Sequence, residues 1–310
     1  MAQLTRKRVI LIESESTYGT GPSMAASTVV LVRDLSITPQ SSDVVNRDVV
    51  RPYLGASEQL LANTKVECTF SVELAGSGTA GTAPRYGDAL KACGFSETIA
   101  SNTSVTYAPV SSSFSSITIH YNVDGVRHIV TGCRGTFVIN AAVGEIPSID
   151  FTFTGIYNAP TDTALPTTTY GNQATPLIFK NGNTTNFELL SFAGGLMNFS
   201  MDVANEIVYR ELVGGTKEVL LTDRAANGSV TIEAPTIAQK DFFSAALTDA
   251  SLGNLTVTHG TAAGNICRFT STKVDIGDIN YGEADGVTML EIPYTLVPSA
   301  ANDEMVLVFT

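Results

Sequence analysis

The stretch "TKVECTFSVEL" (residues 64–74) alternates between apolar and polar side chains along its length. One side of the alternation is apolar and consists of Val66, Cys68, Phe70 and Val72. The other side is polar and consists of Glu67, Thr69, Ser71 and Glu73. Alternation of this kind is typical of a β-strand with one face on a core and the other toward water. The stretch therefore predicts a half-buried strand whose outward face is acidic.

A second strand of the same kind follows about 160 residues later, in "GSVTIEAPT" (228–236). Val230 and Ile232 fall on one side of it, and Thr231 and Glu233 on the other. Three further pairs of segments resemble each other in the same order: 36–50 and 199–213, 84–95 and 238–250, and 116–157 and 254–297. Matches that keep their order indicate an internal duplication.

The spacing between matched segments is about 163 residues early in the chain and about 138 late. The first copy is therefore expected to carry an insertion within 75–115. We predict an N-terminal arm (1–27), a first domain (28–158), a linker rich in Pro, Thr and Asn (159–186), a second domain (187–298) and a C-terminal arm (299–310).

Each copy is predicted to be a small β-sandwich with one short helix, because its strands have one apolar and one polar face. In the first copy, Tyr86, Leu90 and Cys93 are spaced for one helix face, and in the second Phe243 and Leu247 are. The polar strand faces of both copies carry acids and few lysines; these acids are Glu67, Glu73, Asp150, Glu233, Asp275 and Glu291. The ordinary interpretation is a solvated outer face, but such faces usually mix both signs of charge. The recurrence in both copies favours a common role for the acids.

Two long segments, 39–64 and 203–227, combine apolar residues with arginines. The candidates for contact with a neighbouring subunit are Val45, Arg47, Val49, Arg51, Leu54, Leu60, Ile207, Tyr209, Arg210, Leu212 and Leu220. Long connections with this much apolar surface need something to cover them. The alternative is that each segment packs against its own domain.

The 310 residues are 44% hydrophobic and 15% charged, with a net charge of −12. This composition is that of a folded chain with a sizeable core. The negative charge argues against a protein that grips nucleic-acid phosphates with clustered Lys and Arg. It is compatible with a surface along which nucleic acid passes without being held.

Four cysteines (Cys68, Cys93, Cys133 and Cys267) show neither CxxC pairs nor metal-ligand spacing, and they predict buried free thiols made in a reducing compartment. The apolar run Val9–Ile12 is too short for a signal-peptide core. No stretch approaches the about 20 apolar residues of a membrane helix. A soluble chain without membrane contact is therefore expected.

Catalytic patterns are weak. His120, His128 and His259 are scattered, the Gly-rich "GTAGTAP" lacks a following Lys-Ser/Thr, and no GxSxG occurs. Spacing alone leaves a glycosidase carboxylate pair open, but the chain has no Trp for a sugar platform. We predict no enzymatic activity, no cofactor and no metal.

Several stretches carry a family resemblance: "RDVVRPYLGAS", "VELAGSGTAGTAPRYGDALKACGF", "SIDFTFTG", "TFTGIYNAPTDTALP" and "SVTIEAPTIAQKDFF". Through them the chain resembles the major tail tube proteins of bacteriophages with long, non-contractile tails (siphophages). The resemblance covers nearly the whole chain. It implies a mainly β fold of two tandem tail-tube-type sandwich domains, rings of six domains made by three chains, and rings stacked into a tube. It further implies loops and arms that contact the next ring, tape measure and tail terminator or tip proteins as partners, and double-stranded DNA in the lumen. The location would be the virion tail, after assembly in the host cytoplasm.

The residue patterns agree with such a ring. If each domain lends about four strands, six domains close a barrel of about 24 strands, and barrels of 16–18 strands already leave an aqueous channel. The six acids listed above would then line the bore. Alternative functions are a capsid decoration or tail-tip protein, or a cell-surface β-repeat adhesin.

Overall fold

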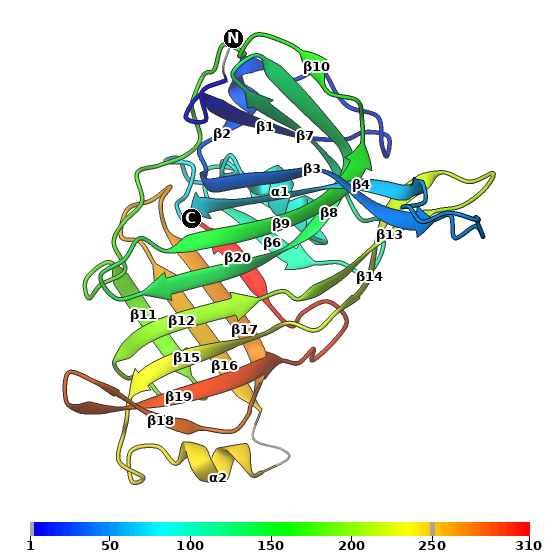
Figure 1. The fold of residues 1–310 in the computed structure, drawn as a ribbon. Coiled ribbons are helices and arrows are strands. Elements are labelled where there is room, and N and C mark those ends of the chain that lie inside the picture. The colour runs from blue at the N-terminus through cyan, green and yellow to red at the C-terminus, as the bar shows by residue number, and fades with distance from the viewer. Residues whose placement is uncertain (1–2, 249–251) are drawn as a thin grey trace.

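The computed structural model describes residues 3–248 and 252–310, and the chain folds into two layers of antiparallel β-structure (Figure 1). Within those residues the longer layer, here called the front sheet, contains eight strands. In spatial order they are β3 (Arg33–Asn46), β4 (Gln59–Glu73), β9 (Ser148–Tyr157), β8 (Val126–Ala142), β12 (Leu196–Asp202), β15 (Asn227–Glu233), β19 (Val287–Leu296) and β18 (Asn280–Ala284).

The second layer, here called the back sheet, lies behind the lower part of the front sheet in Figure 1. Its order is β11 (Thr184–Leu189), β16 (Gly253–His259), β17 (Cys267–Ile276), β20 (Val306–Phe309), β6 (Ser104–Pro109) and β5 (Phe95–Ala100). The two layers join at one corner, where the end of β17 pairs with β19. The prediction of a mainly β sandwich fold is therefore confirmed.

Most of the remaining elements lie in the upper part of the molecule, whereas α2 lies at its lower end (Figure 1). The remaining elements are β1 (Arg8–Ser14), β2 (Val29–Val30), β7 (Ile117–Val123), β10 (Thr161–Asp162), the hairpin strands β13 (Asn205–Glu211) and β14 (Lys217–Arg224), and the short helices η1 (Ala26–Thr28), α1 (Gly87–Ala92) and α2 (Phe242–Ala246). The first half of β8 pairs with β7, which pairs in turn with β1. Its second half continues through the front sheet.

The alternation that predicted the first strand is confirmed in β4. Val66, Cys68, Phe70 and Val72 are at most 3% exposed, whereas Thr69 on the other face is exposed. The same holds in β15, where Val230 and Ile232 are fully buried. The packing explains why the apolar positions recur at every second residue.

The strand pairings of the first half recur in the second. In the first half the strands pair in the order β1–β7–β8–β9–β4–β3. In the second half the order is β11–β16–(β17 and β18)–β19–β15–β12, in which β17 and β18 together correspond to the long strand β8. The hairpin β5–β6, which falls within 75–115, has no counterpart among the described residues of the second half. These pairings support the duplication, and the domain boundaries remain a prediction.

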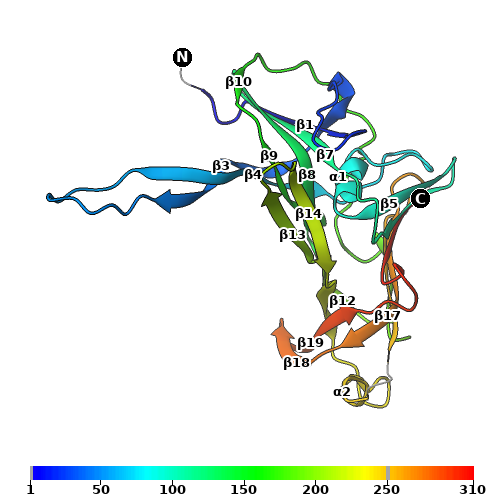
Figure 2. The same cartoon turned by 90° about the vertical axis from the view of Figure 1, so that its right-hand side faces the viewer.

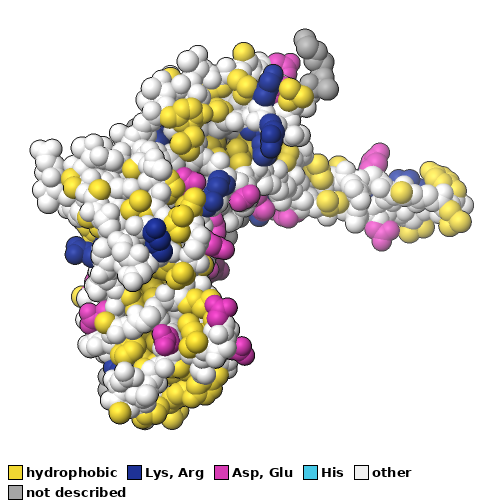
Figure 3. Space-filling model, turned by 90° about the vertical axis from the view of Figure 1, so that its left-hand side faces the viewer, with side chains coloured by type: hydrophobic (Ala, Val, Ile, Leu, Met, Phe, Trp, Pro, Cys, Tyr) yellow, Lys and Arg dark blue, Asp and Glu magenta, His cyan; other side chains and the backbone are white. Residues whose placement is uncertain are grey.

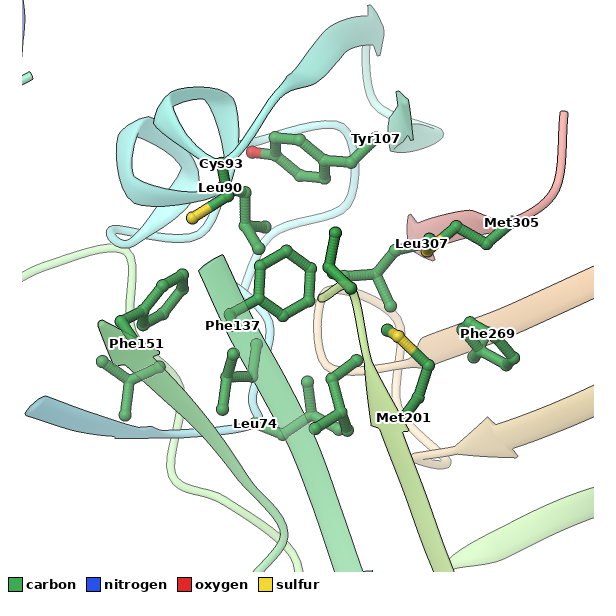
Figure 4. Close-up of a cluster of buried hydrophobic side chains, with 14 of the residues drawn as sticks. Leu74, Leu90, Cys93, Tyr107, Phe137, Phe151, Met201, Phe269, Met305 and Leu307 are labelled. Carbon is green, nitrogen blue, oxygen red and sulfur yellow. The ribbon is translucent and has the colours of Figure 1, made fainter. Parts of the chain in front are cut away.

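The two halves share one core. Side chains from β8, β12, β17, β20 and β6 meet in a single cluster, in which Phe137, Met201, Phe269, Leu307 and Tyr107 are at most 3% exposed (Figure 4). The C-terminal strand β20 lies between β17 of the second half and β6 of the first. The halves are thus packed as one body rather than strung on a flexible connection.

Both segments expected as arms belong to this body. β1 falls within residues 1–27, and its Ile10, Leu11 and Ile12 are buried while the strand pairs along its whole length with β7. β20 falls within 299–310. The apolar side chains of these two strands complete the two layers within the chain. The division of the chain into arms and domains remains a prediction. The linker segment 159–186 is mostly irregular and is fixed to the first half, for example by the Ala174 amide donating to the Gly76 carbonyl over 2.8 Å.

The helices agree with the sequence in part. Tyr86, Leu90 and Cys93 are all fully buried, as the spacing around α1 predicts. In α2 the buried residue is Phe242, at 1% exposure, whereas Leu247 is 86% exposed. The face predicted from Phe243 and Leu247 was therefore wrong at Leu247, because the helix ends at Ala246 and Leu247 caps it.

The cysteines are buried free thiols, as predicted. Burial raises the pKa of Cys68 to about 12. A thiol with so high a pKa holds its proton at neutral pH and is a poor nucleophile. Their contribution is therefore to packing.

Mild acid is expected to lower stability. Burial, with Arg127 nearby, lowers the pKa of His120 to about 4, and burial also lowers the pKa of His128 and His259. A histidine in the unfolded chain has a pKa of about 6.5. Because these pKa values are lower in the folded protein, acid protonates the unfolded chain first and shifts the equilibrium toward it. This stabilisation is complete above pH about 6.5 and is lost as the pH falls toward the folded value. Melting temperatures measured at intervals from pH 7.5 to 5 should fall, and less so in His120→Gln; an equal fall in both proteins would contradict the assignment to His120.

Candidate functional site: the acidic sheet face and the projecting hairpin

The six predicted acids lie on one face of the front sheet and its continuation into β17. Residues directly opposite each other in an antiparallel pair point to the same face. One such row crosses seven strands and contains Ser71, Asp150, Val138, Asp202, Asn227, Thr295 and Asp275. Asp150 and Asp275, from the two halves, are therefore on the same face.

The other four acids share this face by register. Glu67 and Glu73 flank Ser71 at even spacing in β4. Glu291 is opposite Thr231, and Glu233 follows Thr231 by two residues in β15. Their exposure differs: Glu233, Asp275 and Glu291 are exposed, whereas Glu67, Glu73 and Asp150 are half-buried. That the face lines a tube remains a prediction.

Sequence reasoning missed one acid of the row, Asp202 in β12. Its neighbours Met201 and Val203 are buried, so the alternation that identified the other acids also places Asp202 outward. Its carboxylate accepts the Ala204 amide at 2.7 Å. The signal was present in "FSMDV".

Fewer cations share the face. They are Arg33 opposite Ser71, Lys65 beside Glu67, Lys273 beside Asp275, and Arg134 in β8, so four cations stand against seven acids. Lys65 pairs with Glu67 at 3.0 Å. Arg134 is covered, because its guanidinium donates to the carbonyls of Phe114, Ser115 and Val219. The face is therefore net negative.

The β3–β4 hairpin extends well beyond the body and ends in apolar side chains (Figures 2 and 3). The pairing of β3 with β4 continues through three register shifts to Asn46 opposite Gln59. Just beyond it, Arg47 pairs with Glu58 at 2.7 Å. Every large apolar side chain of the outer hairpin is at least 43% exposed: Val44, Val45, Val49, Val50, Tyr53, Leu54, Leu60 and Leu61. Val50 and Leu54 are fully exposed. Of the contact residues predicted in 39–64, all except the half-buried Arg51 are exposed.

The second predicted contact segment behaves differently, because the β13–β14 hairpin is docked on the first half of its own chain. The Asn205 side-chain amide donates to the carbonyls of Cys93 and Gly135 at 2.7 and 2.9 Å. The Val219 amide donates to the Tyr18 hydroxyl at 2.6 Å, and Val219 is fully buried. This part of 203–227 therefore packs on its own chain, but on the first half and not on its own domain, which was the alternative interpretation. Contact with a neighbouring subunit remains a prediction for its exposed residues.

The predicted contact residues of this hairpin divide accordingly. Ile207, Tyr209 and Leu220 are half-buried, and Arg210 is exposed and paired with Glu218 at 3.1 Å. Leu212, near the turn, is 53% exposed. The longest exposed stretch of this hairpin is residues 210–217, which include the turn.

His259 has hydrogen-bond partners at both of its ring nitrogens. His259 accepts from or donates to Thr184 at 3.1 Å and lies near the Leu177 carbonyl, a structural role. Among the described residues, no three His, Cys, Asp or Glu side chains gather as a metal group. None of the helices in the described part of the chain has the length and apolarity to cross a membrane.

The described residues thus combine two layers of β-structure, an acidic sheet face, unpaired outer strands and an apolar projecting hairpin, features that suit a structural protein. Residues 5–296 match the family described as phage tail tube protein. This match covers most of the chain, and the chain belongs to that family. No curated protein matches the chain. The protein is therefore a structural component of a bacteriophage tail, in a family that self-assembles into a tube and is generally non-enzymatic.

Proposed function

We propose that three copies of this chain close into a pseudo-sixfold ring and that these rings stack into the hollow tail tube. The observation that carries the proposal is the front sheet, which presents eight strands in the described residues and ends in unpaired strands on both sides. Three copies of eight strands make a barrel of 24, well above the about 16–18 strands at which barrels hold an aqueous channel.

The acidic face suits the lining of that channel. Duplex DNA carries one negative charge per about 1.7 Å of its axis, and a basic wall would bind it by releasing counterions. An acidic wall repels DNA over a Debye length of about 8 Å at physiological salt. We therefore place Glu67, Glu73, Asp150, Asp202, Glu233, Asp275 and Glu291 at the lumen, where genomic DNA passes during ejection without being bound.

The same assembly defines the other partners. A tape measure protein would occupy the lumen during assembly, and terminator and tip proteins would close the tube ends. Ring stacking would use the β3–β4 hairpin, and assembly would take place in the host cytoplasm before the tail joins the virion.

Charge reversal on the lumen face tests the DNA role. Phage carrying Glu73→Lys, Glu233→Lys and Glu291→Lys together should form tails of normal length but eject DNA several-fold more slowly, because the wall attracts the phosphates. The matched control places glutamine at the same three positions and should give an intermediate rate. Ejection is measured by dye fluorescence of released DNA, and the difference should shrink at high salt. Equal rates in all three phages would refute the lumen assignment.

Electron microscopy of the purified protein tests the assembly itself. Hollow filaments whose axial view shows six lobes with threefold symmetry would support the tube of trimeric rings. Discrete trimers would favour a capsid decoration or tail-tip protein, and monomers would favour an adhesin module. Filaments with another symmetry would overturn the trimer while keeping the tube.

A further inference from the structure

The front sheet ends in two unpaired edges. Among the described residues β3 pairs with β4 alone, and β18 pairs with β19 alone. These strands lie at opposite ends of the sheet (Figure 1). A strand edge presents unpaired backbone N–H and C=O groups that readily pair with another chain.

The middle of the same sheet contains a completed junction between the two halves. There β8 pairs antiparallel with β12, over residues 138–142 and 198–202. On the core side of this junction Ile139 lies opposite Met201, and each is 1% exposed. This junction shows how an edge strand of the second half, β12, pairs with an edge strand of the first half, β8, within one chain.

The repeat makes β18 the counterpart of the second half of β8. Aligning β9 with β19 places Asp150 against Glu291, and these acids lie opposite Val138 and Asn280 respectively. Residues 280–284 therefore correspond to 138–142, and they make up the whole of β18.

The repeat likewise makes the start of β3 the counterpart of β12. Phe70 lies opposite Phe151, as Val230 lies opposite Ile292, so β4 aligns with β15. Two residues before Phe70, Cys68 pairs with Ile37 of β3. Two residues before Val230, Gly228 pairs with Met201 of β12. Residues 35–38 therefore correspond to 199–202, and the register shift of β3 between Arg33 and Ser36 leaves Asp34 without a counterpart.

We propose that β18 of one copy pairs antiparallel with β3 of the next copy in the register of the β8–β12 junction. Asn280 then lies opposite Thr38 of the neighbouring copy, Tyr281 opposite its Ile37, and Gly282 opposite its Ser36. This inference rests on the proposed ring and specifies the contact that closes it.

The side chains at the two edges fit this register. Tyr281 is 69% exposed and points to the core side, where its ring meets Phe243 at 5.7 Å between centroids. In the proposed register Tyr281 lies opposite the half-buried Ile37 of the neighbouring copy. This pair corresponds to Ile139 and Met201 in the β8–β12 junction. The exposed apolar ring thereby becomes covered.

Charge and backbone chemistry agree as well. Glu283 comes opposite Leu35 of the neighbouring copy, and the Leu35 carbonyl accepts a hydrogen bond from Arg8 at 2.7 Å. An acid on one edge thus meets a cation beside the other. The paired segment of β3 ends at Thr38, before Pro39, which has no N–H to continue a ladder.

A cysteine pair tests the register. Directly opposite residues of antiparallel strands have Cα atoms about 4.5–5.5 Å apart, within the about 4.4–6.8 Å that a disulfide spans. Tubes of the Thr38→Cys/Asn280→Cys variant, oxidised and run on a non-reducing denaturing gel, should give covalent trimers. The native cysteines are all buried and do not compete. A mixture of the two single variants should give covalent dimers, which shows that the bond joins different chains.

A shifted pair is the matched control. In Thr38→Cys/Ala284→Cys the second cysteine points to the same face but lies about 13 Å further along the strand, so no cross-link is expected. If tubes form normally but the shifted pair cross-links, or neither pair cross-links, the register is wrong and the proposed tube is unaffected. Cross-linked trimers that never stack would keep the junction and overturn the tube.

Discussion

Removal of residues 48–57 is expected to abolish tube formation while the chain still folds. These residues form the end of the β3–β4 hairpin, where Val50 and Leu54 are fully exposed. Complete burial of one such side chain contributes about 1.5–3 kcal/mol. In the proposed trimeric ring, three hairpins would therefore contribute to the stacking of one ring on another. Without them rings should remain soluble and unstacked.

The deletion can be made without disturbing the strands. The Arg47 amide donates to the Glu58 carbonyl at 3.1 Å, so these residues are close enough to be joined by a two-residue Asn-Gly turn. Circular dichroism should show a nearly unchanged melting temperature, because all of the removed side chains except Arg51 and Ser57 are exposed. Electron microscopy should show no filaments.

Point variants distinguish the effect of the hairpin's length on tube formation from the effect of its apolar side chains. Val50→Ser with Leu54→Ser keeps the hairpin and should shorten or abolish the tubes. The matched control is Ile99→Ser on β5 of the back sheet, which is 54% exposed and should leave tubes normal. Tubes of full length from the deletion variant would show that the hairpin has no part in stacking.

Short-range patterns were enough to predict much of the fold. Alternation in β4 and β15 gave the correct buried face, and the same alternation brought six acids to one face of the sheet. Period-two patterning is a property of neighbouring residues, and register then follows from it because a one-residue slip would bury the acids.

Long-range partners were not predictable in this way. The apolar run Val9–Ile12 gave no sign that it forms β1 against β7, which lies more than a hundred residues later. The docked β13–β14 hairpin contacts Tyr18 and Arg134, which are far from it in the sequence. The Arg134 guanidinium lies 4.8 Å from the Tyr18 ring centroid. The β13–β14 hairpin, which docks, and the β3–β4 hairpin, which projects, have similar composition. Which side chains of each are exposed therefore depends on tertiary contacts.

Loss of Glu304 is expected to destabilise the interface of the two halves strongly. Its carboxylate accepts from Arg224 Nε at 2.6 Å, and the side chains of Arg224 and Glu304 are 12% and 8% exposed. Arg224 also donates to the Val110 carbonyl at 3.2 Å, so it ties β14, the segment after β6 and the segment before β20 together. Glu304→Ala leaves the guanidinium buried without its counter-charge, and breaking such a pair costs about 3–5 kcal/mol.

The double variant distinguishes the buried charge from simple loss of packing. Arg224→Met with Glu304→Leu removes both charges at similar volume, and such replacements of a buried pair are often neutral or stabilising. Urea unfolding should therefore rank the double variant well above Glu304→Ala in free energy of unfolding. A single variant that costs less than about 1 kcal/mol, the value of an exposed pair, would mean that water reaches Arg224 and that the halves are held together by the shared apolar core instead.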